Sequence, residues 1–350
     1  MTLDARCSTA AITARRNTGV MICEGETPAA NATTGKPNFV YSHPDHSRSF
    51  TQEIRLASKT ETRLSWVAGL FYSHESEPTY VRFDYFDTIL QNPAIVNPPA
   101  PPNFYEQLSV PTQTDRSIAA FGDVTVPVTD RFRVRAGLRY TNEHKGADGT
   151  IDAGATGIFT LPTQYNSASD SYSKLTWKAG LDFDVTNRSL LYATVSTGFK
   201  SGGLNNLPAD MDLTTYQPEK ITAYELGSKN RFLDDRLQVN LSLFRYDYKN
   251  YQTFEFYSPT SGPHAGATLF PTVNSQTATF QGGELAAEFA LTADDRLGVS
   301  LNYLHNKFDK FVIDLPYVSV IDLSGTDVPL SPKMAASLSY QHIFRLGNAG

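Results

Sequence analysis

Arginines spaced two and four residues apart, Arg133, Arg135 and Arg139, form the pattern in this sequence that most suggests binding chemistry. Residues an even number of positions apart share one face of a β-strand, so the three guanidinium groups would form a positive strip. Such a strip binds an anionic small molecule through charge-assisted hydrogen bonds. It can instead be neutralised within the protein, because Asp123 is expected on the neighbouring strand, diagonal to Arg135 and Arg139. We favour this structural pairing, with Phe121 facing Arg139.

Aromatic residues concentrate in two long connections of the chain and are the second group of candidate ligand contacts. Aromatic rings supply large contact areas, but alternating aromatic residues also fit an extended strand, and both interpretations stay open. The later connection holds Tyr251, Phe254, Phe256 and Tyr257, and the earlier one holds Tyr80, Phe83, Tyr85 and Phe86.

No motif typical of catalysis is present, because the sequence has no G-x-S-x-G, H-E-x-x-H, C-x-x-C or glycine-rich nucleotide-binding pattern. Asp182 and Asp184 form a D-x-D pair, which the polar face of any strand also gives, and we favour that interpretation. His43 and His46 flank Asp45, but a metal site needs a third fixed ligand. We therefore predict neither enzyme activity nor a metal or cofactor.

Charge and hydrophobicity exclude two classes of protein. The sequence has 30 Lys and Arg against 36 Asp and Glu, a net charge of −6, and no basic run that would bind nucleic acid. No stretch approaches the roughly 18 apolar residues of a membrane helix, whereas the strands of membrane β-barrels alternate and average to mild polarity. The N-terminus lacks a basic segment followed by an apolar one, and Cys7 and Cys23 are either a loop disulfide or two free thiols.

Apolar residues alternate with polar ones through most of the chain, which predicts β-strands with one apolar face. Between Phe132 and Tyr140, for example, every second residue is apolar or aromatic. The same pattern predicts about eleven strands, near 50–58, 63–75, 114–128, 132–144, 171–185, 188–200, 219–231, 236–250, 277–291, 296–308 and 332–345.

Short polar connections alternate strictly with long ones between these strands. The short ones, such as 128–131 and 233–236, predict tight hairpins, and the long ones, such as 75–113 and 251–275, are rich in turn-forming residues. A soluble β-sandwich gives no reason for one end to carry every long connection, whereas an outer-membrane barrel has short periplasmic turns and long extracellular loops. The pattern predicts an all-β, antiparallel up-and-down transmembrane β-barrel. A secreted β-sandwich that binds a ligand, with Leu175, Trp177 and Leu181 buried between two sheets, is the alternative.

One hairpin allows the strand register to be predicted. A three-residue turn at 129–131 pairs Val126 with Val134 on the apolar face and Phe121 with Arg139 on the polar face. A slip of one residue would mix the two faces. Tyr140, near the end of its strand, would then join an aromatic girdle at the membrane interface.

Several blocks of the sequence resemble, in order, the barrel of TonB-dependent outer-membrane receptors. The first blocks are SFTQEIRLAS (49–58), WVAGLFYSHE (66–75), SIAAFGDVTVPVTDRFRVRAGLRYTNEHK (117–145) and LLYATVSTGFKSGGLN (190–205). The most specific block is YQPEKITAYELGSKNRFLDDRLQVNLSLFRYDYKNYQ (216–252), and the series continues with GGELAAEFALTADDRLGVSLNYLHNKF (282–308) and LSPKMAASLSYQH (330–342). The resemblance covers about 49–345, most of the chain.

The resemblance implies import of a scarce nutrient, since members of this family take up ferric siderophores, cobalamin or oligosaccharides. Members also carry a signal peptide, a TonB-contacting box, an N-terminal plug domain and about 22 strands. The first three of these features are not visible here, and the predicted strands are about half that number. We therefore expect a loop-like N-terminal segment at 1–48 and part of a larger barrel at 49–350.

The expected function is that of an outer-membrane receptor barrel for energy-coupled uptake, with a ferric siderophore as the ligand. The expected partners are outer-membrane lipid, the TonB system through a plug domain missing from this sequence, and the small-molecule ligand. Nucleic acid is excluded, and a monomer is expected. The alternative within the same class is a truncated barrel fragment that transports nothing.

Overall fold

The computed structural model describes residues 5–9, 18–25, 39–44, 47–58, 64–77, 80–85, 105–109, 112–151, 164–205, 215–255, 260–262, 271–314 and 320–344. In these ranges every regular element is a β-strand. They contain no helix that is long and apolar enough to cross a membrane.

Eleven strands form the main sheet, and each pairs antiparallel with the next long strand along the chain, which is an up-and-down meander. In chain order they are β4 (Arg48–Ala57), β5 (Ser65–Glu77), β8 (Thr112–Pro127), β9 (Phe132–Ile151), β10 (Gln164–Thr186), β11 (Ser189–Lys200), β14 (Glu219–Phe232), β15 (Leu237–Phe254), β16 (Thr272–Ala290), β17 (Asp295–Lys310) and β20 (Met334–His342).

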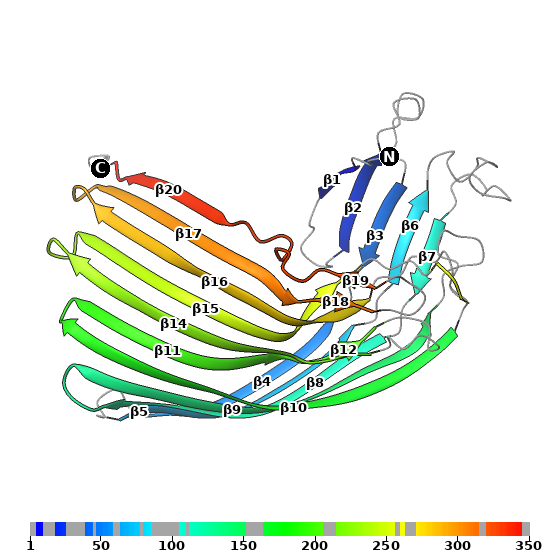
Figure 1. Ribbon diagram of the computed structural model, residues 1–350, viewed down its shortest axis with the longest axis horizontal. Coiled ribbons are helices and arrows are strands. Elements are labelled where there is room, and N and C mark those ends of the chain that lie inside the picture. Colours follow the sequence, from blue (N-terminus) through cyan, green and yellow to red (C-terminus); the bar gives the residue numbers. More distant parts are fainter. Residues whose placement is uncertain are drawn as a thin grey trace, which may run out of the picture.

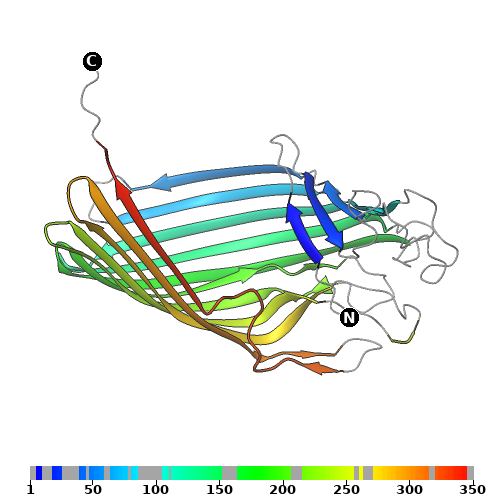
Figure 2. The ribbon, with the colours of Figure 1, turned by 90° about the horizontal axis from the view of Figure 1, so that it is seen from above.

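The main sheet curves like part of a barrel wall (Figure 1, Figure 2). Its short turns gather at one end, and its long connections gather at the other, as the alternation of turn lengths predicts. The long-connection end also carries a five-stranded sheet and two small strand pairs. These are β1 (Ala5–Thr9), β2 (Thr18–Gly25), β3 (Phe39–Pro44), β6 (Tyr80–Tyr85) and β7 (Tyr105–Ser109), with the pairs β12 (Gly203–Leu204) and β13 (Thr215–Tyr216), and β18 (Val312–Ile313) and β19 (Ile321–Asp322).

All eleven predicted strands are confirmed, but several extend beyond their predicted bounds, β9 and β10 by the most. β9 runs on to Ile151 and β10 starts at Gln164, where the sequence predicted a connection from 145 to 170. Polar contacts stabilise this extension, because Lys145 Nζ lies 2.9 Å from Asp115 Oδ2 on β8. The N-terminal segment 1–48 is not wholly loop-like either, since it contains β1, β2 and β3. The boundary between 48 and 49 stays a prediction.

The predicted register of the β8–β9 hairpin is confirmed. Val126 pairs with Val134, and Phe121 pairs with Arg139. The turn is closed by the backbone amide of Val128, which donates to the carbonyl of Phe132 at 2.8 Å. The apolar and polar sets therefore fall on opposite faces throughout this part of the sheet.

The apolar face is uncovered, which shows that the β-sandwich alternative is wrong. Leu175, Trp177 and Leu181 keep exposed fractions of 55%, 41% and 48%, whereas a sandwich would bury them between two sheets. Only an apolar solvent makes such a face stable, because a soluble protein would leave a large apolar patch in water.

Aromatic residues mark both ends of the apolar face. On β14, Tyr224 and Phe232 are both exposed and lie eight positions apart, with leucine between them at Leu226. Eight residues span about 26 Å along a strand, or about 20 Å across a membrane at the usual tilt. This height approaches the band of about 25 Å seen in outer-membrane barrels. Tyr140 and Trp177 are exposed on the same face, and their place in an aromatic girdle stays a prediction.

The two cysteines lie opposite each other on neighbouring strands. Cys7 of β1 is the register partner of Cys23 of β2. Residues directly opposite in an antiparallel pair have Cα atoms about 4.5–5.5 Å apart, a separation that a disulfide can bridge. Whether they pair stays a prediction.

Candidate functional site

The polar face of β9 and β10 carries a network of ion pairs. The Arg133 guanidinium forms a two-pronged pair with the Asp184 carboxylate, in which Nη2 lies 2.9 Å from Oδ1. Arg135 Nη2 lies 2.9 Å from Asp182 Oδ1, and Arg133 Nε lies 3.9 Å from the other oxygen of Asp182. The D-x-D pair is thus the polar face of a strand, and it neutralises two of the three arginines.

Asp123 does not pair with these arginines, so that prediction was wrong. Its carboxylate instead forms an ion pair with Lys178 of β10, two strands away. Gly137 separates the two in the register and makes this contact possible. A Cβ atom at Gly137 would lie 2.5 Å from Asp123 Oδ1 and 2.9 Å from Lys178 Cε, so the charged groups meet in the space that the missing side chain leaves.

A second glycine, two residues beyond Lys178 on β10, allows a similar contact between strands. Arg135 extends over Gly180, whose added Cβ would lie 3.1–3.2 Å from the guanidinium, and reaches Thr194 Oγ1 on β11 at 3.2 Å. By alternation along the sequence, Gly137 and Gly180 both fall on the polar face. The feature of the sequence that could have predicted these contacts is therefore a glycine on the strand between a long charged side chain and its partner.

Arg139 differs from the other two arginines, because it has no carboxylate partner in the described ranges. Its guanidinium lies 5.2 Å from the Phe71 ring centre and 5.5 Å from that of Phe121, and Nε donates to Thr141 Oγ1 at 3.1 Å. The predicted neighbour Phe121 is therefore present, and Phe71 was missed. An uncompensated guanidinium between two rings is the arginine of this strip best able to bind an anion.

Tyr251 belongs to an aromatic cluster at the long-connection end. Its ring centre lies 5.3 Å from Tyr248, 5.7 Å from Phe280 and 6.0 Å from Phe308. Asn250, which precedes Tyr251, has a left-handed backbone with φ of 54°. Simple alternation would place Tyr251 and Tyr248 on opposite faces, and the turn in the chain at Asn250 brings them together.

This cluster anchors the segment that follows β17. Phe311 and Val328 are 1% and 6% exposed, and Phe311 lies 4.7 Å from Phe308 between ring centres. The amide of Val328 donates to Asn306 Oδ1 at 2.8 Å. Tyr251 therefore supports a folded connection, and its direct contact with a ligand stays a prediction.

Phe254 is the predicted contact residue that stays on the surface, with 58% of it exposed. Phe256 and Tyr257 lie outside the described residues, as do Phe86 and the side chains of Tyr80, Phe83 and Tyr85. The adjacent Glu255 is partly buried, which raises the pKa of its carboxyl above the ordinary value.

Gln252 forms hydrogen bonds to several segments at the long-connection end of the sheet. The residue was not among those predicted from the sequence. Its side-chain amide donates to the carbonyl of Ser201 at 2.8 Å and to that of Gln217 at 3.1 Å, while its backbone amide donates to Glu219 Oε2 at 2.7 Å. The residue is 8% exposed. These bonds connect the start of β14 to the end of β11 and fix the backbone next to Tyr251 of the aromatic cluster.

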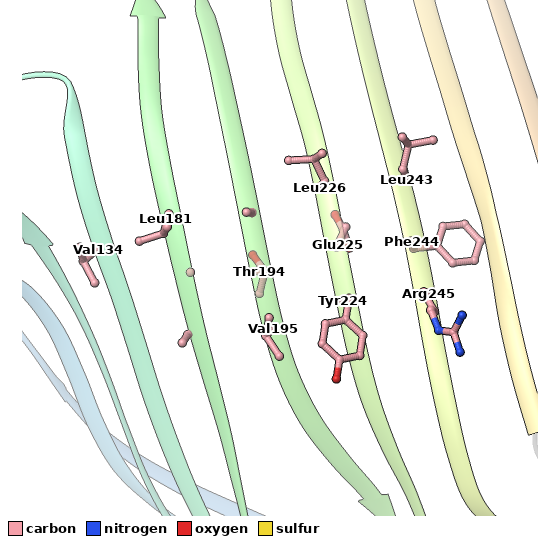
Figure 3. A pocket seen from close by; sticks show the side chains of 13 residues that line it. Val134, Leu181, Thr194, Val195, Tyr224, Glu225, Leu226, Leu243, Phe244 and Arg245 are labelled. Atoms are coloured by element: carbon pink, nitrogen blue, oxygen red, sulfur yellow. The ribbon is translucent and has the colours of Figure 1, made fainter. Parts of the chain in front are cut away.

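A separate groove of about 620 Å³ lies on the apolar face across β10, β11, β14 and β15. Leu181, Leu226 and Leu243 line it, and Tyr224 and Arg245 stand at one end (Figure 3). Arg245 Nε lies 2.9 Å from Asp247 Oδ1. Because the groove lies on the opposite face from the three arginines, it is not part of the candidate ligand site.

Comparison with known proteins assigns this chain to a protein family. Residues 22–350 match the family described as TonB dependent receptor-like, beta-barrel. The catecholate siderophore receptor Fiu of Escherichia coli K12 is 28% identical over 155 residues, which are 39% of this chain and 20% of that receptor. The pesticin receptor of Yersinia enterocolitica is 22% identical over 275 residues, 77% of this chain and 36% of the receptor.

Two solved structures share the fold. The siderophore receptor PiuA of Acinetobacter baumannii superposes with a TM-score of 0.66 at 17% identity, covering 93% of this chain and 48% of that one. The ferric yersiniabactin uptake receptor FyuA of Yersinia pestis gives 0.65 at 17% identity, covering 93% and 43%. The chain thus spans less than half the length of each of these relatives.

The matching family is one of bacterial outer-membrane β-barrels, and the relatives are receptors, not enzymes. The chain belongs to the TonB-dependent receptor β-barrel family.

Proposed function

We propose that this chain forms part of the wall of a receptor that takes up a ferric siderophore through the outer membrane, with energy from the TonB system. The observation that carries the proposal is the family match along 22–350. Two of the relatives are named for catecholate siderophores and ferric yersiniabactin, so a small iron chelate is the ligand class to test first.

The polar face supports an anionic or aromatic ligand. Arg139 is uncompensated among the described residues and stands between Phe71 and Phe121, so it can hold a carboxylate or catecholate oxygen beside two rings. Arg133 and Arg135 are already neutralised by Asp184 and Asp182. In this proposal Arg139 contacts ligand or plug, and the other two arginines keep the wall rigid. Phe254, Phe256 and Tyr257 contact ligand from the extracellular end.

Further strands complete the wall in this proposal. β4 and β20 are the edges of the main sheet and do not pair with each other. An unpaired edge in lipid leaves backbone amide and carbonyl groups without partners, which costs several kcal/mol per group. We propose that these edges pair with further barrel strands and that a plug domain, through which TonB acts, fills the space against the polar face.

The test is uptake of radioactive iron by cells that lack their own siderophore receptors and express the protein as its gene encodes it. Cells receive iron bound to a catecholate or to a phenolate–thiazoline chelator. We expect accumulation with at least one chelate, and we expect it to stop when TonB is deleted. Accumulation no greater than with empty vector for every chelate would reject the ligand class, and accumulation without TonB would reject the coupling.

A pair of arginine variants tests the proposed site. Arg139→Gln should lower uptake about tenfold or more, because a hydrogen bond to a charged group contributes about 1.5–3 kcal/mol. Arg245→Gln is the matched control, because Arg245 lies on the apolar face and already pairs with Asp247. Equal uptake by both variants would remove Arg139 from the site without affecting the receptor assignment.

A further inference from the structure

A row of basic side chains crosses the apolar face at the end that carries the long connections. His74 of β5 is the register partner of Arg116 of β8, and Arg116 is the partner of His144 of β9. Neighbouring strands are about 4.8 Å apart, so the three side chains stand side by side. Arg48, at the start of β4, lies one step further out and diagonal to His74. We call Arg48, His74, Arg116 and His144 the basic row.

The row stands at the upper border of the apolar band. On β9 the same face carries Phe132 beside the short turn and Tyr140 eight residues further along, and His144 is four residues beyond Tyr140. The twelve residues from Phe132 to His144 span about 40 Å along the strand, or about 30 Å across the membrane. An apolar band of about 25 Å ends below that height, so the row reaches the level of lipid headgroups.

No carboxylate neutralises the row within the described part of the chain. Glu75, Asp115 and Glu143 each adjoin a member of the row in sequence, but alternation sends them to the polar face. Asp115 is occupied there by Lys145, and Glu75 Oε1 accepts a hydrogen bond from Ser47 at 3.0 Å.

Neighbouring side chains hold the row in position. The Arg116 guanidinium lies 5.8 Å from the ring centre of Tyr72, which is diagonal to it on β5. His144 Nδ1 lies 2.9 Å from Ser171 Oγ on β10. All four members of the row are exposed.

We propose that the basic row binds the phosphate groups of a glycolipid in the outer leaflet, with the acyl chains lying along the apolar strands below it. A guanidinium flanked by two imidazoles offers several N–H donors in a line, which suits a phosphorylated sugar headgroup. Tyr72 and Phe50 then lie at the junction of headgroup and acyl chain, where aromatic rings are favoured. This site is on the outside of the wall and is independent of the transported ligand.

The experiment compares lipid retention by protein purified from outer membranes in mild detergent. The variants are Arg116→Gln and the triple change His74→Gln, Arg116→Gln and His144→Gln. Lys145→Gln is the matched control, because Lys145 follows His144 but lies on the polar face with Asp115. Lipopolysaccharide per protein is measured by mass spectrometry, and folding is checked by the shift in gel mobility on heating.

We expect Arg116→Gln to weaken binding of added lipopolysaccharide about fivefold, the triple variant to weaken it further, and Lys145→Gln to bind as the unchanged protein does. A second arm uses unchanged protein and lipopolysaccharide from which phosphatase has removed the phosphates, and we expect that lipid to bind at least as weakly as intact lipopolysaccharide binds to the triple variant.

Equal binding of the intact and dephosphorylated lipids would overturn the proposal, and this arm needs no variant to fold. Retention by Arg116→Gln equal to that of Lys145→Gln would overturn it too. Because no iron chelate enters the assay, either failure leaves the proposed uptake function to its own test.

Discussion

On the polar face, charged side chains reach partners on other strands by extending over a glycine. The Asp182 carboxylate forms an ion pair with Arg135 and lies near Arg133, and its side chain is 13% exposed. Asp123 and Lys178 meet above Gly137 in the same way. The sequence predicted which face these charges share, because parity is a local property. It could not predict the partners, because which charges meet depends on how far each side chain extends over two or three strands.

Removal of the Asp182 charge should therefore destabilise the wall. In Asp182→Asn, Arg135 loses a carboxylate partner in a partly buried network, which should cost about 1–3 kcal/mol. The measurement is the temperature at which the folded, fast-migrating form disappears on a gel. Asp235→Asn, at an exposed short turn, is the control and should change that temperature little. An unchanged temperature for Asp182→Asn would show that the network contributes nothing to stability.

The backbone at Asn250 gives a second prediction at this scale. Its φ of 54° is tolerated by Asn and Gly but strains a β-branched residue by about 1–2 kcal/mol. Asn250→Gly should therefore keep the stability and the aromatic cluster, whereas Asn250→Val should lower the unfolding temperature and increase the exposure of Tyr251. Tyrosine reactivity toward iodination measures that exposure. Equal behaviour of the two variants would contradict the role given to this backbone turn.

At the scale of elements, alternation and turn length were enough to predict the main sheet. The pattern predicted all eleven of its strands and the β8–β9 register, because a half-buried strand repeats every two residues. It missed the extensions of β9 and β10 and the small sheets at the long-connection end. Outside the membrane, polar residues occupy both faces of a strand, so the alternation that identifies a strand is lost there.

The segment from Phe311 to Val328 is an element whose docking should depend on pH. Hydrogen bonds from Ser324 lower the pKa of Asp322, and Lys333, whose Nζ lies 2.8 Å from Asp327 Oδ2, lowers that of Asp327. A carboxyl with a lowered pKa in the folded state stabilises it above the unfolded pKa, and this contribution is lost as the pH falls through the folded value. Docking should therefore be constant near neutral pH and weaken below about pH 4.

A spin label at Asp314, in a variant without the native cysteines, measures this docking. We expect its mobility to rise as the pH falls from 5 to about 3. In the double variant Asp322→Asn and Asp327→Asn, the label should be mobile over the whole range. A label that stays immobile at the lowest pH would show that Phe311 and Val328 hold the segment without the two carboxylates.

At the scale of the molecule, the two faces of the sheet have different solvents. Leu181 lies near the middle of the apolar face and is 48% exposed, so Leu181→Arg puts a charge into lipid at a cost of about 2–4 kcal/mol. Ser242→Arg places the same charge on the polar face, where Ser242 is the register partner of Glu284, and should cost much less. Refolding into lipid vesicles with increasing urea measures both. A greater loss for Ser242→Arg would mean that the faces are assigned the wrong way round.

The central claim is that the main sheet spans the outer membrane with its short turns in the periplasm and its long connections outside. Single cysteines at Asp130, in a short turn, and at Ser261, in the connection between β15 and β16, test it in a background with Cys7→Ser and Cys23→Ser. Whole cells are treated with a bulky polymer-linked maleimide. We predict that the cysteine at 261 reacts on intact cells, and that the one at 130 reacts only after the outer membrane is opened. Reaction of the cysteine at 130 on intact cells, with protection of the one at 261, would contradict the account.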